Sequence, residues 1–171
     1  MLQDPLTLYK LIVLYMLDRV TFPLTAAQIS DFILEQEYTN FLTLQQIMSE
    51  LTEAGMLSSQ TIGNRTLLKI TPEGSETLHF FDNRISLSIK QDIDAYFREN
   101  EMTLRNEVSV QSHYYKSTSG EYEANLIAKD KNITLINLTL SVPTEEIARG
   151  ICENWQPKNE QIYQYLIQEL F

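Results

Sequence analysis

The sequence has few of the residues on which metal, redox and phosphate sites depend. Its 171 residues include one cysteine, two histidines and five glycines. Structural zinc sites need clusters of cysteine and histidine, whereas His79 and His113 fall in different predicted domains. No glycine-rich phosphate loop and no nucleophile elbow occurs in the sequence. We therefore expect that the protein is not an enzyme and that it holds neither a metal nor a cofactor.

Long hydrophobic runs and disulfide-forming cysteines are also missing. The longest apolar run near the start, Leu11 to Leu17, is far shorter than the roughly 20 residues that cross a bilayer. Its surroundings lack the charges and the cleavage site of a signal peptide. Cys152 has no second cysteine in the chain to pair with, which suits a reducing compartment. We expect a cytoplasmic protein with no membrane association.

Positive charge is scarce. Thirteen Lys and Arg residues face 23 Asp and Glu residues, for a formal net charge of -10 and a pI near 4.6. Residues 1–82 alone hold four basic and ten acidic side chains, a net charge of -6. Neutralised phosphates supply most nonspecific affinity for DNA. The charge therefore opposes DNA binding by a monomer, although a dimer would gain affinity through effective concentration.

The residues that are present predict an ordered series of elements in the first half of the chain. Apolar periodicity and caps predict three helices: Leu6–Val20, one capped by Thr25, and one that follows Asn40 and runs to Ala54. Two strand-like runs, 56–62 and 65–70, are joined by Gly63-Asn64, a pair typical of hairpin turns. Thr71-Pro72 opens the next helix. This order of elements predicts a winged helix-turn-helix domain.

Several local motifs carry a resemblance to a known family. They are Leu44-Gln45-Gln46 with Glu50-Leu51, Glu53-Ala54-Gly55, Lys69-Ile70-Thr71-Pro72-Glu73-Gly74, Phe80-Phe81 with Arg84-Ile85, and Asn154-Trp155. Across nearly the whole chain the sequence resembles an uncharacterised family of small bacterial winged-helix proteins. That family is a domain of unknown function and is distantly similar to PadR-type and MarR-type regulators. The resemblance implies a fold and the class of bacterial transcription regulators, but no ligand or operator.

The helix over 40–54 is the predicted DNA reader, because the second helix of a helix-turn-helix lies in the major groove. Its apolar stripe turns inward, and glutamine side chains on the opposite face can pair with adenine. We expect DNA contacts from the helix start and exposed face at Thr39, Asn40, Thr43, Gln45, Gln46 and Ser49, and from the wing at Arg65 and Lys69. Taken singly, each of these is more often a solvated or capping residue. The set on this fold favours DNA contact by analogy.

The helix predicted over 86–100 carries an apolar stripe made of Ile89, Ile93, Tyr96 and Phe97. A stripe outside the compact winged domain needs a partner, and a homodimer seam is one explanation. Packing against the C-terminal domain of the same chain explains the stripe equally well.

The last part of the chain reads as three strands followed by two helices. The strands are predicted over 108–116, 121–129 and 133–142, and the helices begin at Pro143-Thr144 and at Pro157. Tyr114, Tyr115, Tyr122 and Trp155 would either line a sensor pocket or fill a core, and aromatic residues at such spacings are more often core.

Together these patterns predict an α+β chain in three parts. They are a winged helix-turn-helix domain over 1–82, a linking or dimerisation helix over 83–102, and an α+β domain over 103–171 that has a three-stranded antiparallel sheet and two helices. The favoured function is a dimeric transcriptional regulator that reads double-stranded DNA with helix 40–54 and wing 56–70. The alternative is an acidic winged-helix module that binds a protein partner without binding DNA directly. An effector ligand is left unidentified by the sequence.

Overall fold

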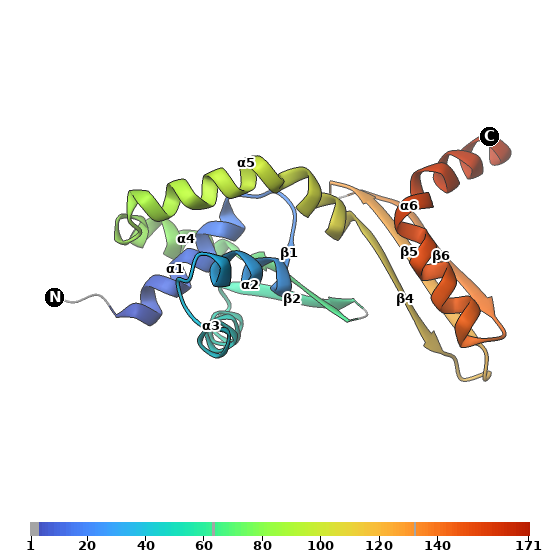
Figure 1. Ribbon diagram of the computed structural model, residues 1–171, viewed down its shortest axis with the longest axis horizontal. Coiled ribbons are helices and arrows are strands. Elements are labelled where there is room, and N and C mark those ends of the chain that lie inside the picture. Colours follow the sequence, from blue (N-terminus) through green and yellow to red (C-terminus); the bar gives the residue numbers. More distant parts are fainter. Residues whose placement is uncertain (1–3, 63, 132) are drawn as a thin grey trace. The chain divides into compact units, whose positions relative to one another are not determined.

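The computed structural model describes residues 4–62, 64–131 and 133–171 and confirms a mixed α+β fold (Figure 1). Its elements in chain order are α1 (Pro5–Asp18), β1 (Leu24–Thr25), α2 (Ala26–Glu35), α3 (Phe41–Glu53), β2 (Leu57–Ile62), β3 (Arg65–Ile70), α4 (Pro72–Phe81), the 3-10 helix η1 (Asp82–Arg84), α5 (Leu87–Ser109), β4 (Val110–Lys116), β5 (Tyr122–Asp130), β6 (Ile133–Val142) and α6 (Glu145–Leu170). The chain divides into two compact units, one extending to Arg105 and the other consisting mainly of Asn106–Phe171.

Side-chain caps explain where the helices of the first unit begin. The free N–H groups of a helix start need acceptors, and short polar side chains provide them here. Thr25 and Gln28 form a reciprocal capping box at the start of α2. The Asn40 side-chain oxygen accepts from the backbone N–H of Thr43, at 2.9 Å, at the start of α3. Thr71 caps α4 in the same way. The local sequence thus separates α2 from α3 and sets the exposed face of α3.

The core of the first unit is built around α1. All residues from Leu11 to Leu17 are buried, and α1 contacts α3, α4 and β3. The strands form a sheet in the order β1-β3-β2, in which Leu24 of β1 pairs with Leu68 of β3. The two-residue strand β1 was not predicted from the sequence. The Gly63 position of the predicted hairpin turn lies outside the described residues.

The second unit is an antiparallel sheet in the order β4-β5-β6 with α6 along one face (Figure 1). Leu126 on the central strand pairs with Ser112 on one side and Leu138 on the other. The core is Leu126, Ala128 and Trp155, and the Trp155 indole donates to the Ile127 carbonyl oxygen at 3.0 Å. Helix α6 contacts β4 and β5 more extensively than β6. One face of the edge strand β6 is therefore incompletely covered.

The prediction of two helices after the sheet is wrong, because α6 runs through Pro157 as one element. Proline removes one backbone hydrogen bond and disfavours a helix interior by about 3 kcal/mol. Here the apolar stripe continues on both sides of the proline, with Trp155 and Ile162 in the same core cluster. Packing of both halves thus keeps the helix continuous, and Figure 1 shows it changing direction part-way along. No helix among the described residues is both long and apolar enough for a membrane crossing.

Candidate nucleic-acid interface

Helix α3 presents the face that its sequence predicts. Leu44 and Ile47 are fully buried, whereas Gln45, Gln46 and Ser49 are exposed. The helical period therefore places amide and hydroxyl groups together on one outward surface. Such groups donate and accept hydrogen bonds at the edges of bases.

The start of α3 combines capping residues with exposed apolar side chains. The Asn40 side-chain oxygen is already used as the cap, and Thr39 and Thr43 are half-buried. The backbone N–H groups of a helix start suit a phosphate group. The sequence interpretation missed Phe41 and Leu42, which are 54% and 79% exposed. The helical period places Leu42 opposite Leu44, so the sequence pattern could have identified it, whereas it places Phe41 near the buried stripe, so only the fold shows that Phe41 is exposed.

A carboxylate that sequence reasoning left out lies within the exposed face. The Gln46 amide donates to Glu50 Oε1 at 2.8 Å, and Lys10 Nζ on α1 lies 2.6 Å from Glu50 Oε2. The hydrogen bond from Lys10, followed by the one from Gln46, lowers the pKa of Glu50. This carboxylate is thus ionised at neutral pH. The spacing of four residues could have indicated the Gln46–Glu50 contact, but the fold alone brings Lys10 to Glu50.

The strand β3 carries the two predicted wing cations. Arg65 and Lys69 are both exposed, and the Lys69 backbone carbonyl accepts a long hydrogen bond from the Ser58 hydroxyl, at 3.5 Å. The polar part of α3 and these two cations belong to the same compact unit. The exposed side chains of α3 and these two cations are therefore available for the DNA contacts that the sequence predicts.

The stripe predicted as a dimer seam is largely covered by the chain itself. Ile93 is fully buried and Phe97 is 6% exposed. The Tyr96 ring lies 4.7 Å from the Phe32 ring of α2, between centroids, and Ile89 is half-buried. The stripe thus packs within the first unit, which neither explanation drawn from the sequence had named. Ile93 has no exposed surface for a second copy.

Comparison with family models identifies the family of this chain. The family model described as Domain of unknown function (DUF4364) matches residues 9–170. The chain belongs to the DUF4364 family. No curated protein and no solved structure matches it. Membership confirms the predicted resemblance to an uncharacterised family, while similarity to PadR-type and MarR-type regulators stays a prediction.

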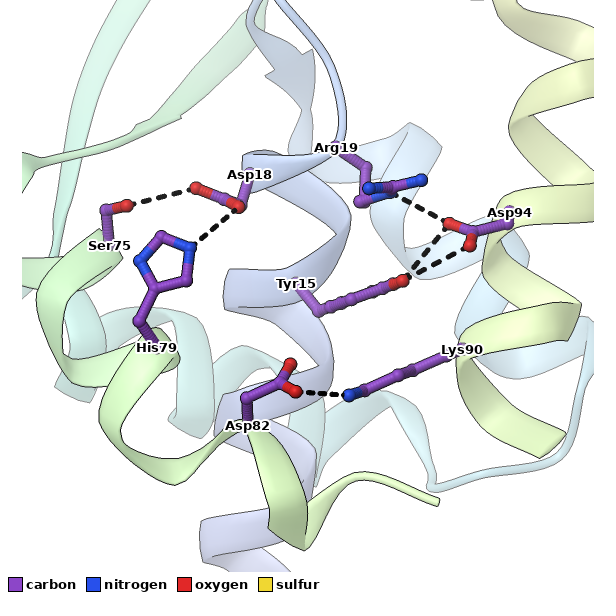
Figure 2. Close-up of polar contacts among 8 residues, drawn as sticks. All are labelled: Tyr15, Asp18, Arg19, Ser75, His79, Asp82, Lys90 and Asp94. Atoms are coloured by element: carbon purple, nitrogen blue, oxygen red, sulfur yellow. Dashed lines mark hydrogen bonds and ion pairs between the residues drawn. The ribbon is translucent and has the colours of Figure 1, made fainter. Parts of the chain in front are cut away.

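Polar contacts fix α4 and α5 of the DUF4364 chain to α1 (Figure 2). Asp94 on α5 accepts from the Tyr15 hydroxyl and from Arg19 Nε at 2.9 Å. Three further contacts join residues of neighbouring elements. Lys90 Nζ lies 2.5 Å from the Asp82 carboxylate, and Asp18 accepts from the Ser75 hydroxyl at 3.1 Å and lies 3.8 Å from His79 Nε2. Each aspartate already faces a donor. These contacts support the frame that holds α3, and we assign them no chemistry.

The described residues contain no group of three or more His, Cys, Asp or Glu side chains that could hold a metal ion. The second unit contains a pocket lined by Trp155 together with residues of β5, β6 and α6. Of the four aromatic residues predicted either to line a sensor pocket or to fill a core, Trp155 lines this pocket and also belongs to the core cluster, whereas the three tyrosines do not line it. The hydroxyl of Tyr114 donates to Glu145 and that of Tyr115 to Glu123, and Tyr122 pairs with Val142 at the end of the sheet.

Proposed function

We propose that this DUF4364 chain is a DNA-binding transcriptional regulator whose first unit is a winged helix-turn-helix. In this proposal α2 and α3 form the helix-turn-helix, and β2 and β3 form the wing. The observation that carries the proposal is the outward face of α3, where Gln45, Gln46 and Ser49 are exposed opposite a fully buried apolar stripe. A helix that buries its apolar face in the core and exposes a polar face suits the major groove of double-stranded DNA.

The exposed groups divide into two roles. Gln45 and Gln46 pair with adenine, and Gln46 exchanges its hydrogen bond with Glu50 for one with the base. Arg65 and Lys69 contact phosphates or the minor groove and set the position of the protein without reading bases. The first turn of α3 holds a phosphate through its backbone N–H groups.

The proposal includes a homodimer in the cytoplasm. Residues 1–82 have a net charge of -6, so a single copy gains little from phosphate neutralisation. Two linked copies multiply their affinity and read two half-sites. Since Ile93 and Phe97 are buried, the dimer contact uses other residues.

Selection of DNA by the purified chain tests this function. Sheared genomic DNA from the source organism is incubated with the chain, and the retained fragments are sequenced. We expect enrichment of a small set of sites, lost when Gln45, Gln46 and Ser49 are all replaced by alanine. Gln91→Ala is the matched control, because Gln91 is exposed on α5 outside the proposed interface. Equal enrichment by the triple variant would exclude α3 as the reader.

The second candidate function is an acidic protein-interaction module. Phe41 and Leu42 favour it, because two large apolar side chains are exposed on one helix start. Cross-linking in cells followed by mass spectrometry tests it with Leu42→Ser. Loss of a specific cross-linked partner in this variant, together with no DNA enrichment by the unaltered chain, would establish the module in place of the regulator.

A further inference from the structure

The pocket of the second unit has the size and lining of a small-molecule site. Its volume is about 500 Å³, within the range of roughly 300–1,000 Å³ typical of ligand pockets. Its apolar walls are Leu126 on β5, Leu138 and Leu140 on β6, and Ile151, Trp155 and Ile162 on α6. Trp155 and Leu126 are buried, whereas Leu140 is 37% exposed. One side of the pocket is therefore core and the other is open to solvent.

Gly150 keeps part of the pocket wall empty. It lies within α6, and a Cβ atom built on it meets no other atom within 4 Å. Glycine in a helix interior is less stable than alanine, and no neighbouring atom requires the glycine here. A side chain at this position would project into the free space. The glycine at position 150 therefore lowers the stability of α6 and leaves space in the pocket for a ligand.

The pocket is lined by one charged side chain, which is positive, and by one amide side chain. Lys158 and Asn154 are its charged and amide side chains. Within the part of the chain that the structure describes, Lys158 forms no ion pair, although the protein has a formal net charge of -10. An unpaired ammonium group next to an apolar wall attracts a ligand with an anionic end and an apolar body.

We propose that this pocket binds a small amphipathic carboxylic acid. The apolar body lies against Leu138, Ile151 and Trp155. The carboxylate accepts hydrogen bonds from Lys158 and from the second N–H of the Asn154 amide, whose first N–H donates to the Gly150 carbonyl oxygen at 2.8 Å. The proposal rests on the second unit alone. It is independent of DNA binding, and its test contains no DNA.

Trp155 provides a direct readout, because it is the only tryptophan of the chain. The full chain is titrated with decanoate and decyltrimethylammonium below their micelle concentrations and with decanol below its solubility limit, and the fluorescence is recorded. We expect a saturable change with decanoate and roughly two- to five-fold weaker binding of decanol, because the pairing lysine is exposed to solvent. The cationic ligand binds most weakly. Calorimetry on the same samples confirms the stoichiometry of one ligand per chain.

Two variants assign the binding to this pocket. We expect that Lys158→Ala removes the preference for decanoate over decanol and leaves decanol binding unchanged. The control is Lys116→Ala, because Lys116 is an exposed lysine on β4; this substitution alters the affinity for neither ligand. Gly150→Leu fills the free space and abolishes binding of both ligands, while circular dichroism shows an intact fold. The proposal is overturned by a linear, non-saturating response to decanoate, by equal affinities for the three ligands, or by unaltered decanoate binding in both Lys158→Ala and a folded Gly150→Leu variant.

Discussion

The Tyr15 hydroxyl on α1 donates to both carboxylate oxygens of Asp94 on α5, at 3.2 Å each. The two residues are 79 positions apart in the sequence, so this contact ties the first helix to a much later one. Arg19 reinforces it from the same side of α1. Tyr15 is only 8% exposed, and burial followed by the charge of Asp94 raises the pKa of its hydroxyl.

Replacing this hydroxyl lowers the stability of the first unit. We expect that Tyr15→Phe reduces the free energy of unfolding by about 1 kcal/mol, since the carboxylate keeps its bond to Arg19 and loses one donor. Urea unfolding followed by circular dichroism measures the change. Tyr9→Phe is the control on the same helix, where no hydroxyl contact with Asp94 exists. Equal stabilities of the two variants would contradict the role assigned to the Tyr15 hydroxyl.

The same hydroxyl makes the stability of the fold depend on alkaline pH. The pKa of Tyr15 in the folded chain is raised above the ordinary value of 10.0. Its contribution is complete below pH 10 and is lost as the pH rises through the folded pKa. Urea unfolding at several pH values on both sides of 10 therefore yields a falling free energy, with a shallower fall for Tyr15→Phe. Parallel curves for the two proteins would show that this tyrosine does not contribute.

Two glycine substitutions change stability in opposite directions. A Cβ atom at Gly74 lies 2.2 Å from the Met56 backbone oxygen, which accepts from the Thr71 N–H. Gly74→Ala therefore forces a backbone shift and destabilises the first unit by roughly 1–3 kcal/mol. Gly150→Ala enters open space in α6 and stabilises the second unit by roughly 0.5–1 kcal/mol.

Separate probes measure the two glycine effects. Circular dichroism follows the helices of both units, whereas Trp155 fluorescence follows the second unit alone, so an unfolding change seen only by circular dichroism belongs to the first unit. A neutral Gly74→Ala variant would mean that α4 does not approach Met56 as closely as described. Loss of stability in Gly150→Ala would mean that the space above this residue is filled.

Glu50 weakens the proposed reading face. Its carboxylate repels phosphate and holds Lys10 and Gln46. We expect that Glu50→Gln raises affinity for a bound duplex by roughly two- to five-fold, because it removes an exposed like charge and releases Lys10. Glu37→Gln removes an exposed acidic charge after α2 and controls for net charge. Fluorescence anisotropy at two salt concentrations measures both variants, and equal gains in affinity would assign the effect to net charge alone.

The sequence predicted the features that depend on local period and capping. The outward positions of Gln45 and Gln46 follow from the buried apolar stripe of α3, and Asn40 caps the helix as its residue type suggests. These signals need no knowledge of distant parts of the chain.

The features that were missed depend on contacts between distant residues. The strand β1 has two residues and exists through its pairing of Leu24 with Leu68. Ile93 has the pattern of an interface residue, and only the fold shows that the first unit buries it. Pro157 reads as a helix start, yet packing on both sides of it keeps α6 continuous. In each case tertiary packing decided between alternatives that the local pattern allowed.

Binding of the purified chain to a labelled duplex from its own promoter tests the central claim most directly. Fluorescence anisotropy is recorded at low and at physiological salt for the unaltered chain, Gln46→Ala and Arg65→Ala. The account predicts submicromolar binding that weakens with salt and is reduced by both substitutions. A folded protein that does not bind the duplex even at low salt would contradict direct DNA recognition.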